Sequence, residues 1–316
     1  MSELFRNVEA RTRLAGTNKL EILLFTLGID GRTGRRETFG LNVFKVREVL
    51  KAPPITAAPE MPGVVEGMVS MRGMLVPVIH LGRYTGITNG AACEVMVVTE
   101  YNGHTQGFLV EAVDTILRLD WGSMRVPPDL LNAHMSSLVT AVTELADGRL
   151  VMMLDVEKIL AETAPPQDEA VFQTIQPVAA AHGLVYFADD SVVAREQIKR
   201  TLDAMSVRHR SAVNGLRAWE DLQRLAEQAE AMGDPVERHV RLILTDIEMP
   251  EMDGYMLTRR IKADPRFNGV PVLMHSSLSS SSNERLGQSV GVDAYVPKFE
   301  PHRLAEMVAE LLGKAA

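Results

Sequence analysis

The sequence predicts a two-domain protein whose first half is all-β and whose second half is a doubly wound α/β domain. A length of 316 residues is about twice that of a typical domain. Between 183 and 316, apolar strand-like runs alternate with helical segments, which is typical of a parallel sheet covered by helices. Between 18 and 164, short β-rich runs separated by Gly, Asn and Asp turns favour barrels or sandwiches.

The first half opens with a segment, 1–17, in which Leu4, Val8 and Leu14 have near-helical spacing, which predicts a short amphipathic helix. The run 20–29 alternates only in part, so we expect that one of its faces is not fully solvated. A helix over 156–162 closes this half. The predicted β-rich runs are 20–29, 38–46, 66–81, 93–101, 104–113, 137–145 and 148–156.

Residues 165–182 combine prolines, small residues and charges without a steady period, which predicts a linker. The segment 227–240, just before the predicted strand 240–245, is longer than the usual connection at this place in a doubly wound fold. We expect an extended helix and loop there. Beyond the linker, the predicted strands lie near 183–188, 207–213, 240–245, 270–275 and 293–296. The predicted helices lie near 191–205, 215–231, 254–263, 280–290 and 301–313.

Polar side chains follow the predicted strands of the second half. Asp189 and Asp190 follow the first strand, Asp246 the third, Ser276 the fourth and Lys298 the fifth. Because the carboxyl ends of parallel strands meet at one edge of a sheet, these groups should converge. Crowded carboxylates repel one another and bind a hard divalent cation, most simply Mg²⁺. A hydroxyl and an ammonium beside them could hold phosphoryl oxygens.

Each of these residues also has a purely structural interpretation. The paired acids could cap the helix that begins near Ser191, since acids and serine are favoured at helix N-termini. Ser276 lies at the start of a polar run that a loop would explain, and an isolated Lys298 would be a surface lysine. Asp253 is expected to be a cap or turn residue. The joint order of the groups along the chain is what favours a phospho-accepting site.

Residues 183–315 resemble the receiver domain of two-component response regulators, on the motif ending in DIEMPEMDG and the residues above. The resemblance implies that Asp246 is the phosphoacceptor and that Asp189, Asp190 and the Glu248 backbone carbonyl help to bind Mg²⁺. It implies that Ser276 and Lys298 contact the phosphoryl group and that Tyr295 is the switch aromatic. Receivers usually place proline directly after the lysine, whereas here Phe299 follows it, which leaves the local peptide geometry open.

The segment SMRGMLVPVIHLG, 70–82, has a glycine hairpin followed by a strand containing proline. With the neighbouring motifs it resembles the CheW family of chemotaxis coupling domains, over about 18–164. The resemblance implies a pair of small β-barrels that binds chemoreceptors and the histidine kinase CheA. It also implies that Arg72 lies on the binding surface; from the residue alone, a hairpin arginine that aids solubility is the alternative.

A coupling domain followed by a receiver is the architecture of the CheV family. The expected function is therefore an adaptor between chemoreceptors and CheA that is regulated by phosphotransfer to Asp246, without a turnover substrate and so not an enzyme. One alternative is a phosphate sink for CheA. Another is an aspartate-dependent phosphatase of the haloacid dehalogenase type, which needs a second acid two residues after the nucleophile. Glu248 is a poor substitute for the usual aspartate there.

Composition excludes several other classes of function. A formal charge of −8 without a Lys/Arg tract argues against nucleic acid as the main ligand. The single cysteine, Cys93, excludes an internal disulfide and fits a reducing cytosol. No run approaches the ~18 apolar residues of a membrane span, and the charged N-terminus is not a signal peptide. We expect a cytoplasmic protein at membrane-associated receptor arrays, without direct membrane insertion.

Overall fold

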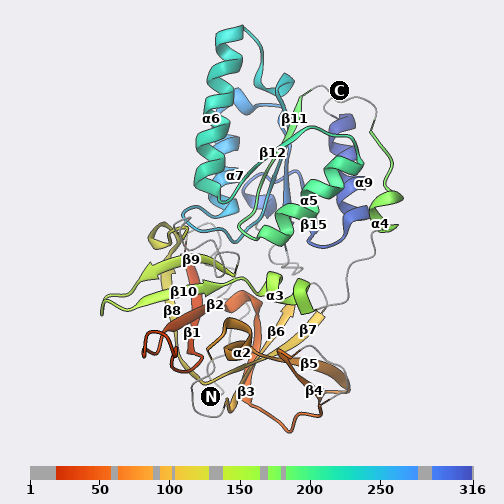
Figure 1. Ribbon diagram of the computed structural model, residues 1–316. Helices are drawn as coiled ribbons and strands as arrows, with labels where there is room; N and C mark the ends of the chain where they lie inside the picture. The colour runs from red at the N-terminus through yellow and green to blue at the C-terminus, as the bar shows by residue number, and fades with distance from the viewer. Residues whose placement is uncertain are drawn as a thin grey trace. The chain divides into compact units, whose positions relative to one another are not determined.

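The computed structural model describes residues 19–57, 63–87, 93–101, 104–127, 138–163, 170–178, 183–276 and 287–314. The chain divides into two compact units, one over Leu20–Ala164 and the other over Pro165–Ala316 (Figure 1). The predicted N-terminal helix lies outside the described residues, as does most of the helix predicted near 280–290.

The first unit contains two five-stranded sheets, each assembled from strands that are distant in sequence. One sheet has the order β8 (Ala112–Asp120), β1 (Lys19–Thr26), β2 (Thr38–Asn42), β10 (Leu150–Leu154), β9 (Val139–Glu144). The other has the order β3 (Val46–Lys51), β6 (Val95–Tyr101), β7 (His104–Val110), β5 (Met74–His80), β4 (Val65–Met71). The pairs β2–β10 and β5–β7 are parallel, so both sheets are mixed.

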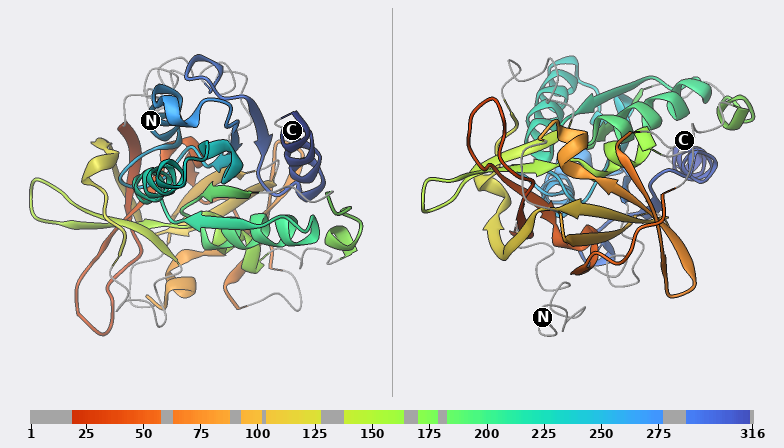
Figure 2. Two further views of the ribbon diagram at one scale, coloured as in Figure 1. Left: turned by 90° about the horizontal axis from the view of Figure 1, so that it is seen from above. Right: turned by 60° about the horizontal axis from the view of Figure 1, so that its bottom comes forward.

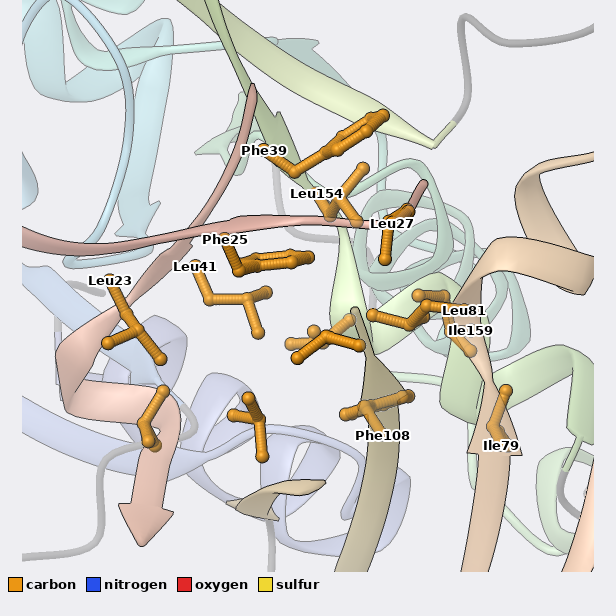
Figure 3. Packing of buried hydrophobic residues seen from close by; sticks show 14 of the residues in the cluster. Leu23, Phe25, Leu27, Phe39, Leu41, Ile79, Leu81, Phe108, Leu154 and Ile159 are labelled. Atoms are coloured by element: carbon orange, nitrogen blue, oxygen red, sulfur yellow. The ribbon is translucent and has the colours of Figure 1, made fainter. Parts of the chain in front are cut away.

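A shared hydrophobic core joins the two sheets, and each sheet also has a core of its own. In β1, Leu23 and Phe25 contribute to the shared core, whereas Leu20, Ile22 and Leu24 contribute to the separate core of their sheet. Both faces of this strand are therefore buried, as its partial alternation predicted. Figure 3 shows the shared core, in which Phe39 and Leu41 of the first sheet face Ile79 and Phe108 of the second.

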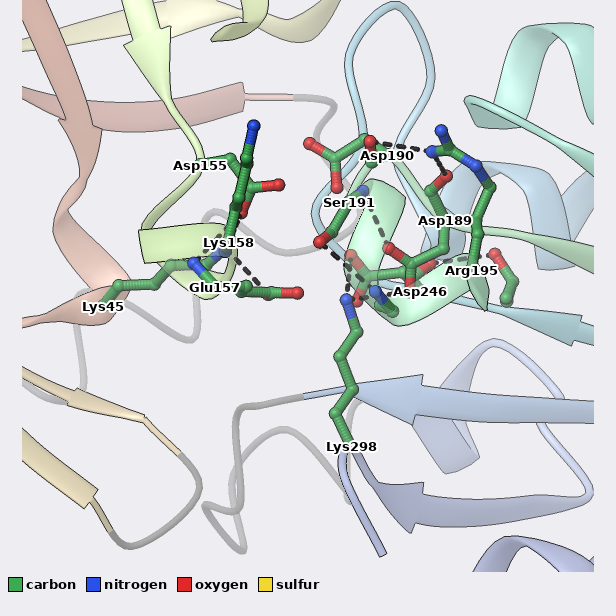
Figure 4. Close-up of polar contacts among 12 residues, drawn as sticks. Lys45, Asp155, Glu157, Lys158, Asp189, Asp190, Ser191, Arg195, Asp246 and Lys298 are labelled. Atoms are coloured by element: carbon green, nitrogen blue, oxygen red, sulfur yellow. Dashed lines mark hydrogen bonds and ion pairs between the residues drawn. The ribbon is translucent and has the colours of Figure 1, made fainter. Parts of the chain in front are cut away.

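Short helices connect the strands of this unit: η1 (Val43–Lys45), α2 (Leu81–Thr85), η2 (Trp121–Ser123) and α3 (Val156–Thr163). The run predicted over 38–46 is broken by η1, because the Asn42 side chain accepts a hydrogen bond from the Phe44 backbone N–H at 3.0 Å. The strand β8 was missed by the sequence analysis, which ended its run at 113. The predicted helix over 156–162 is confirmed as α3, and a partly buried ion pair between Lys45 and Glu157, 3.1 Å, connects it to η1 (Figure 4).

The second unit is built on a five-stranded sheet with the order β12 (His209–Ala212), β11 (Leu184–Ala188), β13 (Val240–Thr245), β14 (Val272–Ser276), β15 (Ala294–Pro297). All of its pairs are parallel, which confirms the predicted doubly wound α/β fold. The helices are α5 (Val192–Ala204), α6 (Gly215–Met232), α7 (Gly254–Ala263) and α9 (Pro301–Lys314), with 3-10 turns η4 (Val236–Arg238) and η5 (Pro265–Phe267). Figure 1 shows α5 and α9 on one face of the sheet and α6 and α7 on the other.

Part of the predicted linker packs against this second unit. It contains a short helix, α4 (Ala170–Gln173), which lies beside α5 and α9 (Figure 2). Ile175, just after α4, is buried in the same core as residues of α5 and α9. The Arg200 guanidinium lies 4.2 Å from the centre of the Phe172 ring, a cation–π contact. The Val178 backbone N–H donates to the Met205 carbonyl at 3.0 Å. Residues 170–178 are therefore an ordered attachment to the receiver-like unit.

Candidate functional site

The polar residues predicted from the strand ends meet at one edge of the parallel sheet. Asp189 and Asp190 follow β11, Asp246 follows β13, Ser276 ends β14 and Lys298 follows β15. Asp189, Asp246, Ser276 and Lys298 are buried, and Asp190 is half-buried. These positions arise because each apolar strand is in register with its parallel neighbour and ends at nearly the same level.

Lys298 lies between two of the carboxylates. Its Nζ is 2.8 Å from Asp189 Oδ2 and 3.1 Å from Asp246 Oδ2, and its side chain is 0% exposed (Figure 4). Carboxylate oxygens of Asp189, Asp190 and Asp246 lie within 4.8 Å of one another. One ammonium cannot balance three carboxylates, so the site retains an excess of negative charge. Closely spaced carboxylate oxygens are the donor set that Mg²⁺ prefers, and the residues present fit that ion.

The acid pair is oriented by the start of α5. Ser191, not either aspartate, is the N-cap of this helix, and its hydroxyl accepts from the Ala194 backbone N–H at 3.4 Å. The Asp189 carboxylate accepts from the Ser191 backbone N–H at 2.9 Å. Arg195 Nη1 donates to the backbone carbonyls of Asp189 and Asp190 at 2.7 and 2.8 Å. The N-cap position therefore belongs to Ser191, and Asp189 binds the backbone N–H of that residue.

Arg195 was not identified from the sequence. It lies one turn into α5, and the sequence alone does not distinguish it from an ordinary solvent-exposed arginine on a helix. Its two hydrogen bonds fix the backbone that carries both acids, and they place a positive charge beside the cluster. The only available signal was its spacing of six residues from Asp189, which is too weak to use alone.

The backbone around Asp246 is tightly packed against the start of α7. A Cβ on Gly254 would lie 1.9 Å from the Asp246 carbonyl oxygen, so only glycine fits there. That carbonyl also accepts from the Thr245 hydroxyl at 2.8 Å. Asp253 is the N-cap of α7 and accepts from the Met256 backbone N–H at 2.6 Å, as the sequence predicted. The backbone carbonyl of the phosphoacceptor candidate is thus held by the Thr245 hydroxyl and by close packing against Gly254.

The remaining predicted residues of the second unit surround this edge. Glu248 is buried in the loop after Asp246. The Ser276 backbone carbonyl accepts from the Lys298 backbone N–H at 3.1 Å, so these two residues share one junction. Tyr295 is half-buried and packs on a cluster that includes Tyr255 and Met274. Burial, chiefly, and the nearby Tyr295 raise the pKa of the Tyr255 hydroxyl.

The peptide after Lys298 differs from a lysine–proline junction. The described residues contain no cis peptide bond, and Phe299 has φ 64°, in the left-handed region. Proline is restricted to φ near −65° and could not occupy this position in the observed backbone. Phe299, which stands where receivers usually have proline, therefore adopts a backbone conformation that proline cannot adopt.

In the first unit, Arg72 is at the tip of the β4–β5 hairpin, where it has φ 50° and precedes Gly73 with φ 81°. Its side chain is 64% exposed and its Nη2 lies 3.0 Å from Glu48 Oε2 on β3. Leu75, on the returning strand, is 71% exposed. An exposed arginine and an exposed leucine thus share one hairpin, although the sequence analysis singled out only Arg72.

Two family comparisons match separate parts of the chain: the CheW-like domain over residues 22–164 and the response regulator receiver domain over residues 185–309. The chemotaxis protein CheV3 of Helicobacter pylori is 29% identical over 284 residues, covering 88% of this chain and 89% of that protein. CheV1 of the same species is 26% identical over 331 residues and covers 99% of both chains. The chemotaxis protein CheY1 of Helicobacter pylori is 31% identical over 127 residues, covering 40% of this chain and 93% of that protein.

The chain contains a CheW-like domain and a response regulator receiver domain.

The CheW-like domain precedes the receiver domain, and the similarity to the CheV proteins extends over both of them. Proteins of this type are adaptors that act in chemotaxis under the control of phosphorylation. Within the described residues, no helix is both long and apolar enough to cross a membrane.

Proposed function

We propose that this CheV-type protein couples chemoreceptors to the histidine kinase CheA and that phosphotransfer to Asp246 tunes the coupling. The observation that carries the proposal is the buried Lys298 ammonium between Asp189 and Asp246, with Asp190 beside them at the edge of a parallel sheet. Such a site combines a carboxylate nucleophile, a cation site and a fixed positive charge. Those are the parts that acyl-phosphate formation needs.

In the proposed transfer, an Asp246 carboxylate oxygen attacks the phosphorus of a phosphohistidine on CheA. A P–O bond forms as the P–N bond breaks, and the histidine nitrogen recovers its electron pair. Lys298 then pairs with a phosphoryl oxygen, and the Ser276 hydroxyl donates to another. Mg²⁺, held by Asp189, Asp190, Asp246 and the Glu248 backbone carbonyl, would supply charge neutralisation of the phosphoryl oxygens.

The switch would act through Ser276 and Tyr295. A phosphoryl group on Asp246 attracts the Ser276 hydroxyl, and this movement vacates space into which Tyr295 can turn. The rotation of Tyr295 then changes the surface that the receiver presents near β15 to its binding partners. A coupling free energy of about 1–3 kcal/mol, the usual allosteric range, would change partner affinity ~5- to 150-fold.

A phosphotransfer experiment tests the acceptor. Phospho-CheA and Mg²⁺ should label the wild-type protein, and Asp246→Asn should lose the label because the amide cannot form an acyl phosphate. Asp253→Asn is a matched control, since Asp253 caps α7 and asparagine caps equally well. Full labelling of Asp246→Asn would contradict the assignment. Labelling of the wild type without any change in receptor or CheA affinity would instead favour a phosphate sink.

The partner surface is proposed for the β4–β5 hairpin of the first unit. Arg72 and Leu75 are both exposed, and Leu75 is the more exposed of the two. An arginine beside an apolar side chain is often found at the centre of a protein interface. Chemoreceptors and CheA are the expected partners of this unit. We place the protein in the cytoplasm at receptor arrays, without nucleic-acid partners.

Charge reversal tests this surface. Arg72→Glu should weaken co-sedimentation with receptor and CheA by about tenfold or more, while its exposed ion pair contributes only ~0–1 kcal/mol to folding. Arg118→Glu is the matched control. The Arg118 side chain is 54% exposed and pairs with Glu21, which is 23% exposed, and the corresponding values for Arg72 and Glu48 are 64% and 24%. Equal effects of both substitutions would show that net charge, not the hairpin, matters.

A further inference from the structure

The loop that follows Asp246 contains a residue in an unfavourable backbone conformation. Glu251 has φ 66°, in the left-handed region, where a residue with a side chain is less stable by about 1 kcal/mol or more. Such a conformation persists only where surrounding contacts hold it. Glu251 lies three residues after Glu248, whose backbone carbonyl is a proposed metal ligand.

The contact that holds Glu251 comes from a different element. Asn214 is 1% exposed and is the N-cap of α6. Its Oδ1 accepts from the Arg217 backbone N–H at 2.8 Å, while its Nδ2 donates to Glu251 Oε2 at 2.9 Å. One amide side chain thus caps a helix and binds the loop at the same time.

The helix start is also pressed directly against the loop. A Cβ on Gly215 would lie 2.4 Å from the Met252 carbonyl oxygen, closer than real Cβ contacts allow. A hydrogen bond from the Gly254 backbone N–H to the Ile247 carbonyl, 2.9 Å, joins the two ends of the loop. The loop is therefore closed at its ends, and its second half is held against the start of α6 at Glu251 and Met252.

We propose that Asn214 is a positioning residue: its bond to Glu251 holds the loop 247–253 so that the Glu248 carbonyl stays where the cation is bound. The inference rests on the proposed function, because it assigns a role to that same metal site. It explains why an asparagine stands at the cap. Aspartate would cap α6 equally well, but it cannot donate to Glu251 and would place one carboxylate against another.

The test uses the full-length protein, with Mg²⁺ affinity measured by calorimetric titration and the rate of Asp246 phosphorylation measured with acetyl phosphate. Asn214→Asp should weaken Mg²⁺ binding by about tenfold, since a hydrogen bond to a charged group becomes a repulsion. Glu251→Ala should have a similar effect and leaves the α6 cap untouched. Glu251→Gln alone should stay close to wild type, because the Gln carbonyl oxygen can still accept.

The decisive variant is the double substitution Asn214→Asp with Glu251→Gln. It reverses the donor and the acceptor, so the glutamine amide donates to the aspartate carboxylate, and Mg²⁺ affinity should return to within about threefold of wild type. A residue that only stabilises α6 would not be rescued from the loop side. Lack of rescue would overturn the inference.

Ala229→Gly is the stability control, because it weakens α6 by about 1 kcal/mol at a position about 20 Å along the helix from Asn214. It should lower the unfolding free energy without changing Mg²⁺ affinity. If Asn214→Asp and Glu251→Ala behave like this control, Asn214 is a cap only and the inference is wrong. If the wild type itself neither binds Mg²⁺ nor becomes phosphorylated on Asp246, the proposed function fails and the inference fails with it.

Discussion

Replacing Lys298 with methionine removes the ammonium that separates two buried carboxylates while keeping most of the side-chain volume. The Lys298 contacts at 2.8 and 3.1 Å are each worth about 5–6 kcal/mol at an effective dielectric constant of ~20. Desolvation of the ammonium offsets more than half of that sum. Breaking a buried pair of this kind costs about 3–5 kcal/mol, and we expect that loss of unfolding free energy when no divalent cation is present.

Saturating Mg²⁺ should reduce the difference between Lys298→Met and wild type by about 1–3 kcal/mol. The excess negative charge at Asp189 and Asp246 is larger in the variant, so the cation binds it more tightly. A ligand present at 100 times its Kd stabilises the folded state by ~2.7 kcal/mol, and a tighter Kd gives the variant more of this stabilisation. The ammonium and the metal would thus balance the same carboxylates.

The two tryptophans make the measurement specific, because Trp121 belongs to the first unit and Trp219 to the second. Urea unfolding followed by Trp219 fluorescence, in a Trp121→Phe background, reports on the unit that contains Lys298. Lys262→Met is the control, since Lys262 pairs with Asp293 at 2.6 Å in a more exposed setting and should cost under about 1 kcal/mol. A loss for Lys298→Met that is the same with and without Mg²⁺ would refute the reasoning.

Two further predictions concern local conformation and pH. Phe299→Pro should destabilise the second unit by about 1–3 kcal/mol more than Phe299→Ala, because proline cannot adopt φ 64°; equal urea midpoints would contradict this. Burial, together with the Arg83 guanidinium, lowers the pKa of His80 below its ordinary value. The unfolded chain therefore takes up this proton first as the pH falls, so His80 should reduce the stability of the first unit below about pH 6.5. His80→Asn keeps an acceptor for the Arg83 backbone N–H, 3.3 Å from His80 Nδ1 in the wild type, and should remove this pH dependence. Parallel stability curves for wild type and variant between pH 7.5 and 5.5 would count against it.

The second unit could be predicted closely because each of its strands is a short apolar run that stops at a polar residue. The strand over 240–245 and the helix over 254–263 have the predicted bounds. Parallel register then brings Asp189, Asp246 and Lys298 together, since the ends of neighbouring parallel strands lie at one level. Local pattern and one topological rule were sufficient for this part of the site.

Contacts between loops could not be predicted in the same way. The hydrogen bond from Asn214 to Glu251 joins residues 37 apart, and either residue alone is compatible with a turn or a cap. The left-handed conformation of Phe299 has no sequence signal, because phenylalanine rarely adopts it. In the first unit, β8 was missed because its moderately polar run continues from β7 with only Glu111 between them.

The attachment of residues 170–178 has a consequence for how this protein is divided. The match to the receiver family begins at residue 185, yet Ile175 is buried in the core beside α9 and the Phe172 ring lies under the Arg200 guanidinium. The folded receiver unit therefore extends further toward the N-terminus than the segment that matches the family. A receiver domain cut from this protein at residue 185 would lose Phe172 and Ile175 and leave part of its core exposed to water, so a fragment for isolated study should begin before residue 170.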